Sequence, residues 1–477
     1  MGDDRAGEGP SRDDGDAPGS LGVSSRSLGQ EIRRLAFPAA LHNLLLTAQF
    51  IVDTKMVGAF GGDDPAPLAS VAIAGPVAWS STVVATFTAV AATALVARRV
   101  GESKPRVASE VAITALVLSL LLGAVVGGLG ALGCAPGIAW LSEVSGGTHS
   151  EPTLEGATGY LFWFFLLFPA RTAFATLAAS FRGSGDARSP LYVAGLGNVV
   201  NIAANAVFIF GLWGAPRMGT AGAGLGGSIA AGVEALALVW IWRRGKTPDL
   251  PWAEGFRGVN WKWVGALARI GWPALLEGVV FHTGFLVYQL AIFSLAESAV
   301  AAHRVAITLQ SLAFMPAAGF YVSASSLSGR LLGANDPDAA RRAAGLNLRY
   351  GVMFMLPVSA LFFFAAEPLC AQFSTDAEVV RFAAVALQIG AIEIPFLLIT
   401  ESLRGTLRGA GETRGPLWVA TLGTWFIRVP AAWAFAADWG CGWGLAGVWY
   451  ATVTDWIVRA ALLAILFRRG RWMQVRV

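Results

Sequence analysis

Charged residues are scarce in this chain. They make up 14% of its 477 residues, whereas about a quarter of a soluble domain is charged. Hydrophobic residues reach 55%, and stretches such as 107–133 and 445–467 hold at most two ionisable groups. Because a helix needs about 20 apolar residues to cross a bilayer, these stretches predict membrane spans. The scarcity of charge excludes an ordinary soluble fold and indicates an all-α integral membrane protein.

Cysteine and histidine are also rare, with three and four residues respectively. Cys134, Cys370 and Cys441 lie far apart and lack the spacing of a metal site, so we expect them to be small packing residues. No Ser-His-Asp or Cys-His pattern supports an enzyme. We therefore expect no catalytic residues, no resident metal and no cofactor.

The one trace of a nucleotide-binding motif is incomplete. Residues 245–247 read Gly-Lys-Thr, the end of a phosphate-binding loop, but Trp240 stands where that motif requires an earlier glycine. No strand is expected before it either. We therefore expect a proton or sodium gradient, rather than ATP, to be the energy source.

Apolar runs separated by glycine, proline and charge predict twelve spans in two lobes. Residues 1–30 are polar and typical of a disordered cytoplasmic tail, without the apolar core of a signal peptide. The N-lobe covers 31–245 and the C-lobe 263–470, with a cytoplasmic linker at 246–262 and a short cytoplasmic tail at 471–477. The predicted spans are 35–60, 67–97, 107–133, 155–180, 188–212, 220–242, 263–293, 298–329, 343–366, 379–403, 414–436 and 444–467.

Basic residues fall mainly on one side of this map. Most of the 35 lysines and arginines lie in the tails and in every second loop, while the other loops hold mostly acids. This bias sets the orientation of membrane proteins during insertion. It predicts an inner-membrane protein with both termini in the cytoplasm, and it explains the net charge of +4 without nucleic-acid binding. We expect a monomer in the lipid bilayer.

The two halves repeat one another. Residues 181–190 read FRGSGDARSP and residues 407–416 read LRGAGETRGP, so both arginines, both glycines, the acid and the proline match. Each half has an even number of spans, so the two lobes point the same way across the membrane, as in transporters with parallel repeats. Two such lobes can enclose a cavity that opens to either side. The matching turns themselves are interpreted as structural.

Asp53 is the sharpest functional candidate. At about 1.5 Å per residue it lies about 28 Å along its helix from Arg34, and an ionisable group at such a position is costly unless it has a function or a partner. His42, Gln49 and Asp53 follow helical spacing and form one polar stripe. We expect Asp53 to carry a proton or hold a cation, with a structural tie to Lys55 or to the backbone as the alternative.

Pro38 lies on the same helix before this stripe. Proline removes a helical hydrogen bond and permits a bend, so Pro38 is a candidate hinge. Its alternative is a harmless place in the first turn.

Further polar residues are spaced along two other spans. Asn198, Asn201 and Asn205 share one helical face, and can either complete a proton or sodium site with Asp53 or hold helices together. The other candidates for the wall of a substrate cavity, besides His42, Gln49 and Asn198, are Glu277, His282 and Gln289. The remaining embedded acids, interpreted mainly as structural partners of Arg171, Arg428 and Arg459, are Glu234, Glu393, Glu401 and Asp455.

These features together resemble multidrug and toxic compound extrusion (MATE) transporters over about residues 32–470. The resemblance is carried by the two matching turns and by the segments 52–58 (VDTKMVG), 301–305 (AAHRV), 314–319 (FMPAAG) and 201–222. It implies export of amphiphilic, often cationic compounds in exchange for protons or sodium ions, by alternating access of two six-helix lobes.

The resemblance also assigns residues. Asp53 matches the first-helix aspartate of the proton-type, DinF-like branch, whose protonation bends the helix near the proline that matches Pro38. Asn201 matches a polar residue of the N-lobe cation site. Asn205 stands where other members hold an aspartate, and Leu397 stands where the sodium-type branch has an acid. These departures favour protons over sodium.

Two rival functions use similar architectures. A lipid-linked precursor flippase of the same superfamily is expected to have a more cationic cavity than the mixed embedded charges of this chain. A sugar or amino-acid symporter is expected to have inverted rather than parallel repeats.

Overall fold

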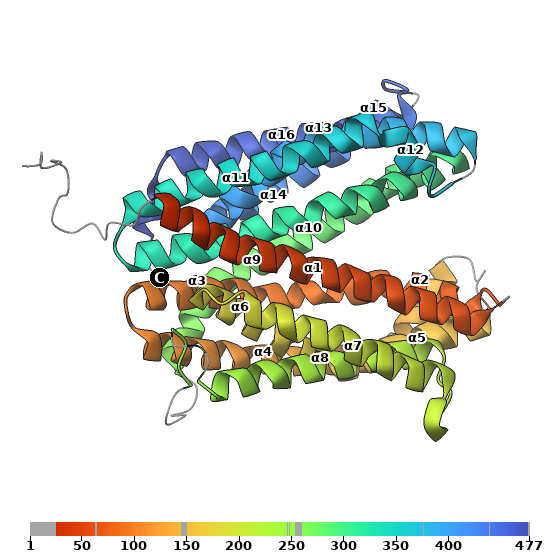
Figure 1. Ribbon diagram of the computed structural model, residues 1–477. Coiled ribbons are helices and arrows are strands. Elements are labelled where there is room, and N and C mark those ends of the chain that lie inside the picture. The colour runs from red at the N-terminus through yellow and green to blue at the C-terminus, as the bar shows by residue number, and fades with distance from the viewer. Residues whose placement is uncertain are drawn as a thin grey trace, which may run out of the picture.

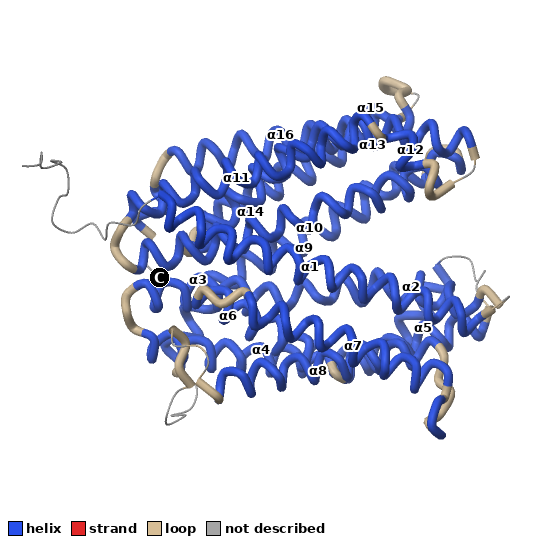
Figure 2. The backbone as a smooth tube through the Cα atoms, in the orientation of Figure 1, coloured by secondary structure: helices blue, strands red, loops and turns tan. Residues whose placement is uncertain are grey.

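The computed structural model describes residues 25–62, 64–144, 150–245, 247, 249–252, 260–374, 376–437 and 439–475. This part of the chain is helical, with short loops at the ends of the helices and no strand (Figure 2). Eleven helices within it are long and apolar enough to cross a membrane, and a bent pair makes a twelfth span. The predicted all-α membrane fold of twelve spans is confirmed.

The first six spans form the N-lobe. Residues 66–101 are one span made of three helical pieces, and the fourth span is broken by a bend of 52°. The helices are α1 (Ser25–Gly61), α2 (Ala66–Ser81), η1 (Thr82–Val84), α3 (Ala85–Gly101), α4 (Pro105–Val144), α5 (Glu151–Leu166), α6 (Phe168–Ser184), α7 (Arg188–Phe210), η2 (Leu212–Gly214) and α8 (Thr220–Arg243).

The last six spans form the C-lobe. Its eleventh span contains a π-helix, a wider turn that changes which residues face inward. The helices are α9 (Trp261–Phe293), α10 (Glu297–Gly333), α11 (Pro337–Phe364), α12 (Ala366–Cys370), α13 (Ala377–Gly409), α14 (Arg414–Thr421), η3 (Leu422–Arg428), α15 (Val429–Ala436), α16 (Gly444–Arg468) and η4 (Arg471–Gln474).

The ends of the chain differ from the prediction. Helix α1 begins at Ser25, inside the tail predicted for 1–30, and residues 1–24 lie outside the described part. The tail predicted for 471–477 contains η4, whose buried Trp472 stacks on Phe467 at 5.3 Å. Most of the predicted linker at 246–262 also lies outside the described residues, and α9 already begins at Trp261.

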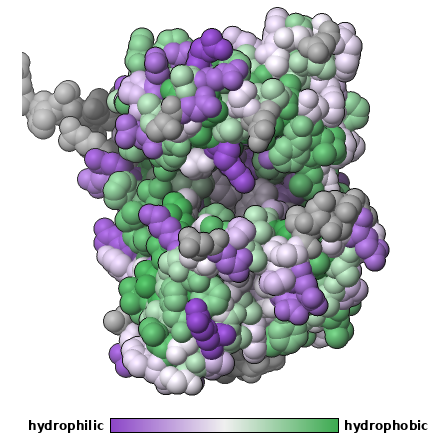
Figure 3. All heavy atoms as spheres, turned by 90° about the vertical axis from the view of Figure 1, so that its right-hand side faces the viewer, coloured by the Kyte–Doolittle hydropathy of each residue, from purple (hydrophilic) through white to green (hydrophobic). Residues whose placement is uncertain are grey.

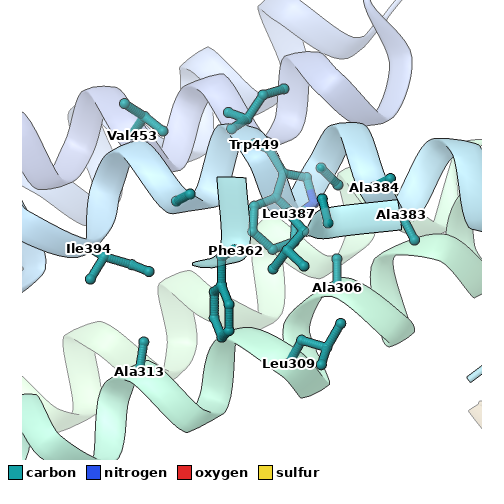
Figure 4. Packing of buried hydrophobic residues seen from close by; sticks show 14 of the residues in the cluster. Ala306, Leu309, Ala313, Phe362, Ala383, Ala384, Leu387, Ile394, Trp449 and Val453 are labelled. Carbon is teal, nitrogen blue, oxygen red and sulfur yellow. The ribbon is translucent and has the colours of Figure 1, made fainter. Parts of the chain in front are cut away.

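Each lobe has its own apolar core. Helices α10, α11, α13 and α16 pack around Leu309, Phe362, Leu387 and Trp449 in the C-lobe, where alanines let the helices approach closely (Figure 4). The N-lobe core is built by α3, α4, α6, α7 and α8 in the same way. The positions of these helices that face lipid are apolar as well, as is usual for helices packed inside a membrane.

The first helix of each lobe crosses to the other lobe. The start of α1 packs through Ile32 and Leu35 against Leu327 of α10, and the start of α9 packs through Leu267 and Ile270 into the N-lobe core. Further along, α1 packs against α7, so its two halves belong to different lobes. Any relative motion of the lobes must therefore bend or tilt α1 and α9.

The lobes meet closely at one end. A side chain at Gly101 of α3 would meet the Arg330 carbonyl of α10, Ser326 donates to the Arg182 carbonyl at 2.7 Å, and Arg330 lies 3.6 Å from Glu31. The start of α1 and the C-terminal end lie at this closed end (Figure 1). At the opposite end the surface is hollowed between the two lobes (Figure 3).

Candidate functional site

Asp53 lies in the second half of α1, where it faces α7. The side-chain amide of Asn205 donates to Asp53 Oδ1 at 2.6 Å, and the same amide nitrogen lies 3.5 Å from Asn201 Oδ1. Both asparagines are completely buried. Their spacing of four residues puts them on one face of α7, one turn apart. The structure thus brings together the three residues predicted to couple ions, and their role stays a prediction.

Charge around Asp53 is not balanced. Arg171 of α6 interacts electrostatically with both Asp53 and the buried Glu234 of α8. Its guanidinium stacks over the Phe164 ring at 4.4 Å and donates to Ser228 at 3.3 Å, which holds it in place. If both carboxylates are ionised, Arg171 balances the charge of one of them, and a proton or a second cation is needed for neutrality. An uncompensated charge in such an environment is expensive.

Glycines leave room for this cluster. A side chain at Gly226 of α8 would meet Asn205 Oδ1, and one at Gly197 of α7 would meet the Glu234 carboxylate. Within the described chain, Asn205 Oδ1, Asn201 Nδ2 and Glu234 Oε1 are buried and have no hydrogen-bond partner. Two of these atoms, Asn205 Oδ1 and Glu234 Oε1, are acceptors that the hydrogen bonds of this conformation leave unused.

The polar stripe of α1 faces the N-lobe. His42 is buried with its ring 6.0 Å from Phe174 of α6, and its role in the cavity wall stays a prediction. Gln49 is half-buried on the same face. The opposite face of α1 meets α10, where Thr47 donates to Met315 Sδ at 3.4 Å. The stripe therefore opens to the interior of the N-lobe rather than to the hollow between the lobes.

Asn198 is separate from its two neighbours. Its amide donates to the Ala194 carbonyl of its own helix at 3.0 Å, and the side chain is half-buried. Of the three asparagines predicted to share one face, two are therefore grouped with Asp53. The third is hydrogen-bonded to the backbone of its own helix.

Glu277 is enclosed by ion pairs in the structure, and its predicted place in a cavity wall is not tested by them. It is buried between α9 and α13, where Arg404 Nη1 lies 3.1 Å from Oε1 and Arg408 Nη2 lies 2.6 Å from Oε2. Arg404 also pairs with Glu401, and Arg408 donates to the hydroxyl of Tyr321 at 3.1 Å. Arg408 is the first arginine of the second matching turn. No pattern in the sequence indicates that this arginine reaches an acid on another helix.

The other two predicted cavity residues of α9 are His282 and Gln289. His282 stacks on Trp79 of α2 with 4.1 Å between ring centroids, and its Nδ1 lies 3.5 Å from Ser80 Oγ. It is half-buried and forms a contact between the two lobes. Gln289 is half-buried too, and its buried Oε1 has no partner in the described chain.

The C-lobe contains a second polar cluster. Asp455 of α16 is buried between Arg428 at 2.7 Å and Arg459 at 2.5 Å, as expected for structural ion pairs. Glu393 of α13 differs, because its hydrogen bonds come from Gln310 and from Thr452, the latter at 2.8 Å. The sequence pattern placed Glu393 among the paired charges. Its neutral partners, Gln310 and Thr452, lie on other helices, and the sequence does not show that they meet Glu393.

Two parallel six-span lobes, closed at one end and hollowed at the other, define a two-lobe membrane transporter fold. The MatE family model matches residues 38–207 and 273–434, which is more than half of the chain. The chain therefore belongs to the MatE family of multidrug and toxic compound extrusion transporters.

Relatives and solved structures agree with this assignment. The chain is 27% identical to the probable multidrug resistance protein NorM of Thermotoga maritima, covering 93% of each chain. It is 30% identical to a probable NorM of Pseudomonas aeruginosa, covering 94% of this chain and 90% of the relative. An outward-facing multidrug resistance MATE family transporter superposes with a TM-score of 0.83 at 21% identity, covering 94% of this chain and 97% of the other. The bent form of the Vibrio cholerae MATE transporter VcmN superposes with a TM-score of 0.82 at 19% identity, covering 93% and 97%.

Proposed function

We propose that this transporter exports amphiphilic, often cationic small molecules in exchange for protons, with Asp53 as the coupling carboxylate. The observation that carries the proposal is the neutral partner of Asp53. An amide, not an arginine, donates to its carboxylate at 2.6 Å, and Arg171, which interacts electrostatically with Asp53, interacts with Glu234 as well. A carboxylate held in this way can gain and lose a proton without breaking an ion pair.

Protonation acts on the contact between α1 and α7. The ionised Asp53 accepts from Asn205 Nδ2, whereas a protonated carboxyl carries a hydrogen that needs an acceptor. Asn205 Oδ1 is buried and free to accept within the described chain. Uptake of a proton thus changes which amide atom faces α1. The hydrogen bond that fixes the second half of α1 changes with it.

Pro38 converts this change into a motion of α1. The first half of α1 is packed on the C-lobe, where Ala36 and Ala40 lie against Gly319, and the second half is packed on α7. Pro38 lies well inside the helix, within the part packed on the C-lobe, which excludes a place in the first turn. Because proline cannot donate to the Arg34 carbonyl, the helix bends most easily there. This supports the hinge role.

The structural arrangement favours protons over sodium. A sodium ion at Asp53, Asn201 and Asn205 would need oxygen ligands, but Asn205 turns its amide nitrogen toward Asp53. Asn205 is also neutral, and within the described residues Asp53 is the carboxylate that is hydrogen-bonded to the amide pair. Sodium coupling is the alternative, and it requires the Asn205 amide to turn over.

The orientation follows from charge. The closed end carries both ends of the described chain and most of the basic loops, which supports a cytoplasmic location for this end. The hollow then faces outward, toward the side where exported compounds leave. We propose an inner-membrane monomer. The buried charges of both signs argue against a flippase for phosphate-linked lipids.

The test is efflux of a fluorescent organic cation from everted vesicles, energised separately by a proton and by a sodium gradient. We expect Asp53→Asn to reduce proton-driven transport at least about tenfold, a loss typical of a missing proton-transfer group. Glu155→Gln, at an exposed acid of α5, is the matched control and should transport normally. Undiminished proton-driven transport by Asp53→Asn would overturn the coupling role. A requirement for sodium would overturn the ion assignment alone.

A further inference from the structure

A groove of about 640 Å³ lies between α9 and α14, near the closed end of the bundle. Two arginines and two tryptophans line it, namely Arg269 and Trp272 of α9 and Arg414 and Trp418 of α14. The tryptophans are 58% and 67% exposed. The groove belongs neither to the Asp53 cluster nor to the hollow between the lobes.

The positive charge of this groove is unmatched. Arg269 and Arg414 are exposed, and neither forms an ion pair within the described part of the chain. The nearest acid in the turn, Glu412, is occupied because it accepts from the backbone of Gly415 at 2.8 Å. Two guanidinium groups at a membrane surface without a protein partner are suited to a phosphate, which they can bind through several N–H groups.

The groove continues into a surface that faces lipid. The side of α9 that packs on the N-lobe carries Gly271, which lies against Phe87, so Arg269 and Trp272 point away from the protein. Exposed apolar side chains extend from the groove toward the other end of both spans. They are Leu276, Val279, Leu286 and Leu290 on α9, and Leu422 and Phe426 on the span that begins with α14.

The repeat places similar residue types in the N-lobe. Arg34 and Phe37 precede Pro38 as Arg269 and Trp272 precede Pro273. Arg188 and Tyr192 likewise occupy the positions in the first matching turn and the span after it that Arg414 and Trp418 occupy in the second. All four N-lobe residues are exposed, and α1 and α7 are neighbours as α9 and α14 are. The pattern is thus shared by both lobes, unlike Asp53.

A second groove shows that the charge is specific to this end. It has a volume of about 530 Å³, lies between α4 and α5 at the opposite end, and is lined by Glu151 and Glu155 without any arginine. An anionic headgroup would be repelled there and attracted at the groove between α9 and α14.

We propose that the groove between α9 and α14 binds one anionic phospholipid. The phosphate lies between Arg269 and Arg414, the tryptophans pack at the level of the headgroup and glycerol, and an acyl chain follows the apolar strip of α9. Basic pockets between spans and interfacial tryptophans are suited to this ligand. The lipid is a bound component of the transporter and not its cargo.

The probe is dioleoylphosphatidylglycerol added to the detergent-purified full-length protein, with lipid binding counted by native mass spectrometry. Dioleoylphosphatidylcholine has the same chains and no net charge, and inorganic phosphate tests for a free anion. In Arg269→Gln/Arg414→Gln, we expect the apparent affinity for one phosphatidylglycerol to fall roughly 10- to 30-fold, the loss of two arginine–phosphate attractions. The charge-matched control Arg341→Gln/Arg342→Gln changes two exposed arginines of α11 and should bind normally.

Several results would overturn the proposal. They are unchanged phosphatidylglycerol binding by the groove variant, an equal loss in the α11 control, and displacement of the lipid by inorganic phosphate at similar concentration. Equal binding of phosphatidylcholine would also contradict a charge-based site. Because both arginines are exposed, the groove variant should unfold at the wild-type temperature without lipid, which separates lost binding from lost folding.

Discussion

The two lobes share a fold but treat buried charge differently. In the N-lobe, Asp53 and Glu234 share one arginine, Arg171, and Asp53 is held by an amide. In the C-lobe, Glu277 touches two arginines and Asp455 touches two others. The N-lobe cluster therefore has one carboxylate more than it can neutralise.

This difference concerns the partners of each carboxylate. Loss of the charge of a carboxylate between two arginines would leave both cations unpaired in an apolar interior. A carboxylate with a neutral donor has no such constraint. The same residue type therefore joins helices through ion pairs in the C-lobe, whereas in the N-lobe it has the neutral partner on which the proposed proton exchange depends.

The largest effect should come from the same isosteric change made in each lobe. Asp455→Asn leaves Arg428 and Arg459 buried without their carboxylate, which should cost about 3–5 kcal/mol of unfolding free energy. Asp53→Asn keeps an acceptor for Asn205 and should cost about 1 kcal/mol or less. Denaturant titrations of both variants in the same detergent measure the difference.

The comparison of lobes fails if these two variants lose equal stability. Glu401→Gln offers an intermediate control, because Glu401 is half-buried and pairs with Arg404, which keeps Glu277 as a second partner. Its loss should fall between those of the other two variants.

The fold was predictable from the sequence because it depends on composition. Charge-free stretches long enough to span a bilayer, the distribution of basic residues and the matching turns at 181–190 and 407–416 are all local features. The exchange of α1 and α9 between the lobes was not predictable. It depends on which face of each helix packs against which neighbour. Because membrane helices are apolar on every side, their sequences do not mark that face.

The candidate site was predictable only along single helices. Helical spacing put Asn201 and Asn205 on one face, and the structure groups both with Asp53. The same reasoning placed Glu277 in a cavity, although two arginines of α13 enclose it. Partners on other helices decide whether an embedded acid is free or paired, and spacing within one span carries no information about them.

A second prediction disturbs the N-lobe cluster without changing any charge. A methyl group at Gly226 would meet Asn205 Oδ1, so Gly226→Ala should displace the amide from Asp53 and cost about 1–3 kcal/mol through overpacking. Proton-driven efflux should fall severalfold more than protein stability alone explains. Gly232→Ala on the same helix is the matched control, because no atom lies within 4 Å of its added methyl group.

Transport assays on equal amounts of folded protein separate the two effects of Gly226→Ala. Wild-type efflux by this variant would mean that the amide of Asn205 need not contact Asp53, and the proposed proton exchange between α1 and α7 would then be wrong. A defect of similar size in Gly232→Ala would point to α8 as a whole rather than to the cluster.

Glu393 is the sharpest test of the comparison, because it is a C-lobe carboxylate whose hydrogen bonds come from neutral groups. Glu393→Gln keeps an oxygen for Gln310 but turns an amide toward the Thr452 hydroxyl, which can reverse its own hydrogen bond. The expected stability loss is therefore about 1 kcal/mol or less. If coupling belongs to the Asp53 cluster alone, proton-driven efflux by Glu393→Gln should stay within about twofold of wild type, against a loss of at least about tenfold for Asp53→Asn. A comparable loss in both variants would mean that both lobes contain a coupling carboxylate. A coupling carboxylate would then be distinguished by its neutral hydrogen-bond partners and not by the lobe in which it lies.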